Sequence, residues 1–344
     1  MDVYRTVGLT PPNLRRADVI AATGVDGDRT VRWWRAMGFP EVPDDVVAFN
    51  DVDVDLVARL GELEDAGLLE DGDVLRLARL LGASFQRIAE AQLALMEELL
   101  AKVPGADPEL LLRDRLGALL DQDDPTLMKL LHRSMTYVWQ RHMIAALGRR
   151  LDPERAVDTE PSDDGATHEM AVGFADLAGF TKLSRSLTAA ELTLLIDTFE
   201  STAFEVVAES EGRVVKLIGD EVMFVAPTLV GALHIALELG ERLATMPGLP
   251  PVQCGVTFGP TVSVAGDVFG TTVNLASRLT SIARKGTVVI PRELLPLAEL
   301  DPGLSVRPSR RNYSLKGLGD TKIAVVTLAE STGAEEGEAE LSRR

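Results

Sequence analysis

Two aspartates occupy positions from which they could bind metal ions together. Asp176 ends an apolar segment that is predicted to be a buried strand, and Asp220 lies in the turn of a predicted hairpin, in the sequence KLIGDE. Carboxylates on neighbouring strand ends can hold hard divalent ions such as Mg²⁺ or Mn²⁺. Each aspartate also has a purely structural interpretation. Asp176 could cap the next helix, and Asp220 could be a residue that merely favours the turn.

The segment after the first aspartate could bind a phosphate chain. It reads Leu177-Ala178-Gly179-Phe180-Thr181, and its small residues predict a tight turn into a helix. Main-chain amides at a helix start lack partners inside the helix and can donate to an anion. A carboxylate beside such amides would place a divalent ion next to phosphate oxygens.

A third segment, DVFGTTVNLASR, contains an amide and a cation on one predicted helix. Asn274 and Arg278 are four residues apart and therefore share a face of that helix. Asp267 precedes Asn274 by seven residues and lies outside the helix. Taken alone, each of these residues could be an ordinary surface group.

Together these motifs resemble those of the class III nucleotide cyclases, the adenylate and guanylate cyclases, over about residues 168–328. FADLAGFT is similar to the first metal-binding motif of that family and KLIGD to the second. DVFGTTVNLASR is similar to the third motif, and LKG at 315–317 to a late lysine motif. The resemblance implies a cyclase that uses two divalent ions, Mg²⁺ or Mn²⁺.

The resemblance also implies a role for each matching residue. Asp176, Leu177 and Asp220 would bind the metal ions, and Asn274 and Arg278 would be the catalytic residues. The residues implied in substrate binding are Lys216, Asp267, Lys316, Leu177, Gly179, Phe180 and Thr181.

The proposed base selectors favour ATP as the substrate. Lys216 can only donate hydrogen bonds, and an ionised Asp267 can only accept them. Adenine presents an acceptor at N1 and a donor at its amino group, whereas guanine presents a donor and a carbonyl. We therefore expect an adenylate cyclase that forms 3′,5′-cyclic AMP and pyrophosphate, with a guanylate cyclase as the nearer alternative.

Members of this family form head-to-tail dimers with shared sites, so the resemblance implies a homodimer. One subunit would supply the two metal-binding aspartates, and its partner would supply Lys216, Asp267, Asn274 and Arg278. The segment 259–266, GPTVSVAG, departs from many relatives, which have a longer arm with a basic residue there. This chain has no basic side chain in that segment. The phosphate contact that the basic residue would make in those relatives is therefore not assigned to any residue of this chain.

The predicted elements that position these residues alternate along the second half of the chain. The order strand, helix, strand, strand, helix, strand predicts an α+β, ferredoxin-like (split βαβ) catalytic domain. A capping box at Thr188 and Glu191 predicts the start of its first long helix. The predicted segments are strands at 170–174, 213–217, 222–225, 252–258, 287–290 and 323–328 and helices at 188–209, 229–243 and 273–283.

The first half predicts a different domain. Leucines at spacings of three and four predict an all-α domain over 1–150, similar to the regulatory domain of some short-arm bacterial cyclases. A polar segment at 151–167 is predicted to be a linker, the catalytic domain spans 168–329, and the acidic segment 330–344 is predicted to be a disordered tail.

The segment 17–49 resembles a helix-turn-helix of bacterial transcription regulators. One interpretation is DNA contact through Arg29, Arg32 and Arg35, and the other is a helical scaffold in which Trp33 and Trp34 are partly buried. The acidic surroundings favour the scaffold, because binding to DNA requires neutralisation of its phosphates.

The charge of the whole chain excludes several partners. Its 35 basic and 53 acidic residues give a net charge of -18, which disfavours extended nucleic acid and anionic membranes. A single cysteine, Cys254, requires no oxidising compartment, and the sequence contains neither a signal peptide nor a long apolar span. We therefore expect a cytoplasmic protein without membrane partners.

Two further hypotheses concern the regulation of the enzyme and a function without catalysis. Histidine titrates near neutral pH, so His142 and His168 are candidate switches for a pH-responsive enzyme. The alternative from another functional class is a non-enzymatic, nucleotide-sensing or DNA-binding regulator that uses the fold to dimerise. The complete set of matching residues favours the enzyme.

Overall fold

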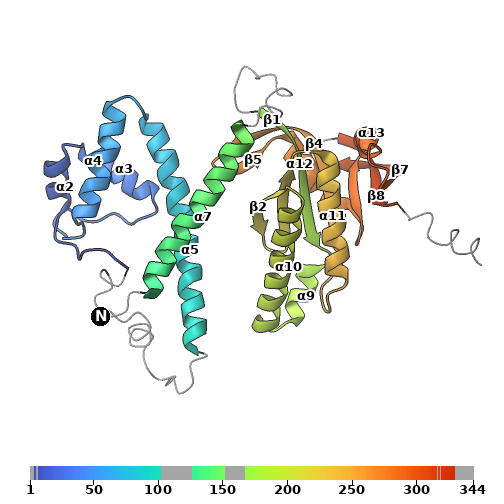
Figure 1. The fold of residues 1–344 in the computed structure, drawn as a ribbon, viewed down its shortest axis with the longest axis horizontal. Coiled ribbons are helices and arrows are strands. Elements are labelled where there is room, and N and C mark those ends of the chain that lie inside the picture. Colours follow the sequence, from blue (N-terminus) through green and yellow to red (C-terminus); the bar gives the residue numbers. More distant parts are fainter. Residues whose placement is uncertain are drawn as a thin grey trace, which may run out of the picture. The chain divides into compact units, whose positions relative to one another are not determined.

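The computed structural model describes residues 4, 7–101, 126–151, 167–315, 317 and 319–329. The chain forms two compact units, 1–156 and 157–344, which contain the elements shown in Figure 1. The predicted linker and tail fall almost entirely outside the described residues.

The second unit is built on one mixed sheet. Its strand order is β2-β3-β1-β4-β6-β8-β7, and β5 pairs separately with β4. The β4–β6 pair is parallel, and the other pairs are antiparallel. The strands are β1 Thr167–Leu177, β2 Arg213–Ile218, β3 Glu221–Ala226, β4 Val252–Val264, β5 Asp267–Phe269, β6 Val288–Pro291, β7 Leu304–Leu315 and β8 Gly319–Leu328.

The first four strands of this unit and the two long helices that connect them confirm the split βαβ prediction. The chain runs β1–α10–β2–β3–α11–β4, with α10 at Ala189–Glu209 and α11 at Leu229–Ala244, and the four strands lie in the order β2-β3-β1-β4. Both helices pack against one face of the sheet, and α12, Thr271–Ile282, packs against the other (Figure 1).

The start of α10 agrees with its predicted capping box. The Thr188 hydroxyl accepts a hydrogen bond from the Glu191 amide, and the Glu191 carboxylate accepts one from the Thr188 amide at 2.8 Å. Several strand limits differ from the prediction. Both β1 and β4 are longer than predicted, and β5 and β7 were not predicted. His168, expected at the end of the linker, lies in β1.

The core on the α12 side depends on a glycine. A Cβ atom on Gly255 would lie 2.4 Å from the Thr280 nitrogen and 2.5 Å from the Ala276 oxygen. The missing side chain therefore allows α12 to rest directly on β4. Cys254, its neighbour, is buried in the core on the opposite face, as expected of a small apolar residue.

The regular structure described in the first unit is helical, apart from one bridge between Leu14 and Phe49. The all-α prediction is therefore confirmed for those residues. The helices described are α2 Arg16–Thr23, α3 Gly27–Ala36, α4 Asp51–Asp65, α5 Asp71–Ala101 and α7 Thr126–Leu151.

The arginines of α3 form ion pairs with carboxylates of their own unit. Arg29 pairs with Glu64, Arg32 with Asp71 at 3.3 Å, and Arg35 with Glu41. These carboxylates already neutralise the cations that DNA contact would require, which supports the scaffold interpretation.

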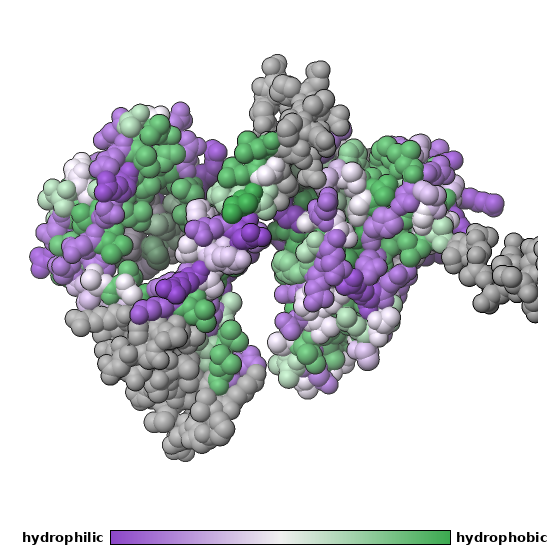
Figure 2. Space-filling view, in the orientation of Figure 1, coloured by the Kyte–Doolittle hydropathy of each residue, from purple (hydrophilic) through white to green (hydrophobic). Residues whose placement is uncertain are grey.

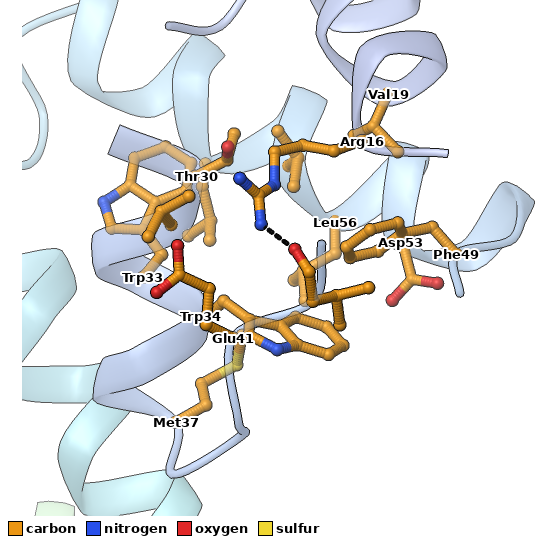
Figure 3. Close-up of a pocket in the computed structure, with 14 residues that line it drawn as sticks. Arg16, Val19, Thr30, Trp33, Trp34, Met37, Glu41, Phe49, Asp53 and Leu56 are labelled. Atoms are coloured by element: carbon orange, nitrogen blue, oxygen red, sulfur yellow. Dashed lines mark hydrogen bonds between the residues drawn. The ribbon is translucent and has the colours of Figure 1, made fainter. Parts of the chain in front are cut away.

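Apolar side chains of this unit surround a hollow between α2, α3 and α4 (Figure 3). Trp33 is only 2% exposed, whereas Trp34 is half-buried and donates from its indole nitrogen to the Pro40 oxygen at 2.8 Å. The guanidinium of Arg16 reaches into the hollow, donates to the Val42 oxygen and pairs with an exposed aspartate. The hollow is thus part of the folded scaffold.

Among the helices described, none combines the length and apolar character needed to cross a membrane. Figure 2 shows hydrophilic and hydrophobic residues interspersed over the visible face.

Candidate active site

The two predicted metal-binding aspartates lie side by side. Asp176 is the penultimate residue of β1, and Asp220 lies in the turn between β2 and β3. The amide of Leu177 donates to the main-chain oxygen of Asp220 at 3.1 Å, which ties the turn to the end of β1. The hairpin thus brings together two carboxylates that are distant in the sequence.

The electrostatics of this pair favour a bound cation. Burial, followed by the charge of Asp220, raises the pKa of Asp176 to about 6. Burial, followed by the charges of Asp176 and Asp220, raises the pKa of Glu221 to about 7. A divalent ion would relieve this repulsion, and its hard character suits carboxylate oxygens.

The side chains alone form an incomplete metal site. Within the part of the chain that the structure describes, no group of three or more His, Cys, Asp or Glu residues is arranged to hold a metal ion. Two carboxylates plus substrate phosphates and water are nevertheless a common ligand set for Mg²⁺. The aspartate pair therefore fits an ion that is held jointly with a phosphorylated substrate.

The residues after Asp176 form the predicted tight turn. Gly179 has a φ of 83° and begins the short helix α9, Phe180–Leu183. The Ala178 amide donates to the Pro251 oxygen at 3.0 Å, which anchors the turn to the start of β4. Because the Leu177 side chain is fully buried, only its main chain can reach a ligand. Gly179 and Thr181 are exposed, and Phe180 is half-buried.

The predicted base selectors form a second pair. The Lys216 ammonium lies 2.6 Å from Asp267 Oδ2, and the two side chains are 36% and 29% exposed. Asp267 lies in β5 rather than in a loop, and its Oδ1 accepts from the Val268 amide at 2.8 Å. Arg213 of β2 donates to the Gly266 oxygen at 3.1 Å, so the β4–β5 hairpin is joined to β2 beside the pair.

Asn274 and Arg278 form a third group, on α12. Both are exposed on α12, whereas Ala276 and Leu279 on its opposite side are buried against the sheet. Among the residues that the structure describes, neither makes a hydrogen bond or an ion pair with Asp176 or Asp220. Within the described residues, no hydrogen bond or ion pair therefore joins this group to the aspartate pair of the same chain.

Three other predicted residues lie outside these groups. Lys316 is outside the described residues, although its neighbour Leu315 is buried at the end of β7. His142 is exposed on α7. His168 is exposed in β1, and its main-chain oxygen accepts from the Thr261 hydroxyl at 2.9 Å.

The sequence interpretation missed two residues beside Asp176. Glu221 and Gln253 are its partners in the neighbouring strands, so all three side chains lie on one face of the sheet. Gln253 Nε2 donates to Asp176 Oδ2 at 2.8 Å and holds that carboxylate in place. Glu221 could have been found as the acidic residue after Asp220, but only the strand register reveals Gln253.

Comparison with known proteins decides the family. The profile described as the adenylate and guanylate cyclase catalytic domain matches residues 163–329, and the adenylate cyclase regulatory domain matches 1–144. An adenylate cyclase of Glutamicibacter nicotianae is 33% identical over 93% of this chain and 80% of its own length. The chain belongs to the adenylate and guanylate cyclase family. Its regulatory domain precedes its catalytic domain.

The matches between this cyclase and other relatives cover a smaller share of those relatives. An adenylate cyclase of Streptomyces coelicolor is 39% identical over 78% of this chain and 67% of its own length. A pH-sensitive adenylate cyclase of Mycobacterium tuberculosis is 34% identical over 78% of this chain and 65% of its own. The cyclase thus spans about two thirds of the length of these relatives.

The two solved cyclase structures compared next each match about half of this chain. The adenylyl cyclase of P. aeruginosa is 22% identical, with a TM-score of 0.42, over 48% of this chain and 97% of its own. The catalytic core of a rhodopsin-guanylyl cyclase with converted specificity is 22% identical, with a TM-score of 0.44, over 48% and 99%.

Proposed function

We propose that this enzyme is an adenylate cyclase that converts ATP to 3′,5′-cyclic AMP and pyrophosphate. The observation that carries the proposal is the Lys216–Asp267 pair, which presents a donor and an acceptor 2.6 Å apart. The ammonium has further protons and the carboxylate further lone pairs, so both can still bind a base. They complement N1 and the amino group of adenine, and the names of the relatives agree with this choice.

The direct test is the formation of cyclic AMP from ATP and Mn²⁺ by the intact chain. An Asp220→Ala chain serves as the inactive control. Formation of cyclic GMP from GTP at an equal or higher rate would overturn the assignment of the substrate.

In the proposed mechanism, the ribose 3′-oxygen attacks the α-phosphorus and its hydroxyl proton passes to water. The bond between the α-phosphorus and the pyrophosphate oxygen breaks, and pyrophosphate leaves. Asp176 and Asp220 would hold divalent ions, which would supply Lewis acidity to the hydroxyl and positive charge to the leaving group. Asn274 orients the ribose so that the hydroxyl is in line with the bond that breaks. Arg278 stabilises the negative charge that develops on the α-phosphoryl oxygens.

This mechanism requires a second chain. Arg278 and Asn274 point away from their own sheet, and an adjacent subunit would bring its aspartates to them. Exposed apolar side chains lie beside both halves of the site, with Ile218 next to the Asp220 turn and Val264 and Phe269 on the β4–β5 hairpin. Burial of these three side chains would favour a homodimer with two equivalent sites.

The metal requirement gives a prediction that is independent of turnover. Because burial and Asp220 raise the pKa of Asp176 to about 6, protonation stabilises the metal-free fold, and this stabilisation is lost as the pH rises through that value. Metal binding requires the ionised carboxylates. Mn²⁺ should therefore raise the midpoint of thermal unfolding more at about pH 8 than at about pH 5.

Differential scanning fluorimetry measures this effect, with Asp176→Asn as the matched variant. The variant should lose most of the shift at the higher pH. An equal shift at both pH values, or a full shift in the variant, would contradict the metal assignment.

We also propose that residues 1–150 control the catalytic dimer in response to pH, through His142 and His168. The match to a regulatory domain and the name of the pH-sensitive relative support this proposal. Unchanged turnover after removal of residues 1–165 would contradict control by the domain. An unchanged pH–activity profile in the His142→Ala/His168→Ala chain would contradict the role of the histidines.

A further inference from the structure

We propose that Lys285 supplies the phosphate contact that the short β4–β5 arm lacks. Its ammonium would bind the nucleotide's triphosphate on the subunit that carries Asp176 and Asp220. This inference rests on the proposed function, because it assigns a further substrate-binding residue to the same reaction.

The position of the Lys285 side chain suggests this role. Lys285 lies between α12 and β6, more than a hundred residues after Asp176 and more than sixty after Asp220. Its Nζ atom is 3.8 Å from the position that a Cβ atom on Gly179 would occupy. Gly179 follows Asp176 by three residues and begins α9. The ammonium therefore lies over the turn that follows Asp176.

The main chain holds these two turns together. The Ala178 amide donates to the Pro251 oxygen at 3.0 Å, and the Gly286 amide donates to the Val252 oxygen at 2.8 Å. Both turns are thus anchored to consecutive residues at the start of β4. Gly286 has a φ of 71°, which allows the chain to turn directly after Lys285. The sheet itself therefore sets the distance between the lysine and the aspartate pair.

The charges nearby indicate what the ammonium would bind. Lys285 is exposed and makes no hydrogen bond or ion pair with another described residue. The carboxylates of Asp176, Asp220 and Glu221 repel one another and would repel a polyanion in the absence of cations. An ammonium with three donors suits phosphate oxygens. Among the residues that the structure describes, Lys285 is thus a cation without a bound carboxylate, at the place where the substrate's negative charge would need one.

The arm that carries a basic residue in many relatives cannot provide this contact. Residues 259–266 include neither lysine nor arginine, and the hairpin turns at Ala265-Gly266, directly before Asp267. A contact from the segment 283–287 would come from the same subunit as the metal-binding aspartates. It would hold the phosphate chain between the lysine and the ions.

The test uses the full chain with Lys285→Gln, Lys285→Arg and the matched control Arg284→Gln, which removes the adjacent exposed cation. We measure kcat and KM for ATP with Mn²⁺, the inhibition constant of pyrophosphate, and its dissociation constant by calorimetry. Loss of a charged hydrogen bond should raise KM and both pyrophosphate constants at least about tenfold, with kcat changed less than about threefold. Lys285→Arg should recover most of the affinity, and Arg284→Gln should resemble the wild type.

Unchanged pyrophosphate affinity in a folded Lys285→Gln chain would overturn the inference. An equal loss in Arg284→Gln would also overturn it, because the effect would then reflect general surface charge. A wild-type chain that makes no cyclic AMP would refute the proposed function instead. Calorimetry with pyrophosphate and Mn²⁺ would still test Lys285 in that case.

Discussion

A mixture of Asp176→Ala chains and Arg278→Ala chains is expected to form cyclic AMP, although neither chain does so alone. Each substitution should lower turnover at least about 100-fold, because one removes a metal ligand and the other a group that stabilises the transition state. Recovery requires that the two residues act in one site from different chains. The exposed position of Arg278 on α12, away from its own sheet, is the structural reason for this expectation.

The size of the recovery follows from the symmetry of the dimer. In a mixed dimer, one site has both defects, and the other combines the intact aspartate of one chain with the intact arginine of its partner. Random exchange of equal amounts makes about half of the dimers mixed, so about a quarter of all sites should be intact. Initial rates of cyclic AMP formation after co-incubation measure this fraction.

A matched control separates recovery in a shared site from nonspecific recovery. Asp176→Ala mixed with Asp220→Ala should stay inactive, since every site would contain one defective aspartate pair. Native mass spectrometry of chains with different tags shows whether exchange took place. Absence of recovery in the first mixture, with exchange demonstrated, would refute the split site.

The double substitution Lys216→Glu/Asp267→Asn is expected to reverse the choice of base. The glutamate presents an acceptor where adenine N1 would sit, and the asparagine can present its amide donor where the adenine amino group would sit. Guanine has a donor at N1 and a carbonyl next to it, so the altered pair complements guanine. The kcat/KM ratio of ATP to GTP, measured for both chains, reports the change.

The expected magnitude follows from two mismatched contacts. Each unpaired buried polar group costs about 1–3 kcal/mol, so two mismatched contacts should lower the ratio at least about 30-fold. The Arg292→Glu/Glu299→Gln chain makes the same change of charge at two exposed positions and should keep the wild-type ratio. A double variant that still prefers ATP by the wild-type margin would show that this pair does not select the base.

Local sequence signals were sufficient for much of the catalytic unit. The Thr188–Glu191 capping box, the Gly219–Asp220 turn and the apolar strands depend on neighbouring residues, and the structure agrees with each of them. The same signals predicted that the two aspartates lie at the ends of neighbouring strands. Strand lengths were less predictable, because the outer parts of β1 and β4 lack a continuous apolar pattern.

The direction of Lys216 depends on an irregularity that the sequence does not reveal. Val214 and Leu217 pack on the α10–α11 side of the sheet, and Val215 packs on the α12 side. Strict alternation would send Lys216 to the same side as Val214, into the core. A shift of register between Val214 and Lys216 instead turns the lysine to the α12 side, where it meets Asp267.

The sequence by itself thus determined which residues could perform the chemistry and which elements carry them, because residue type and local periodicity depend on near neighbours. Only the tertiary structure decided which of these residues meet. Strand pairing placed Gln253 beside Asp176, and hydrogen bonds to the start of β4 placed Lys285 beside Gly179. Packing of α12 through Gly255 turned Arg278 outward. These contacts join residues far apart in the chain, so no local pattern specifies them.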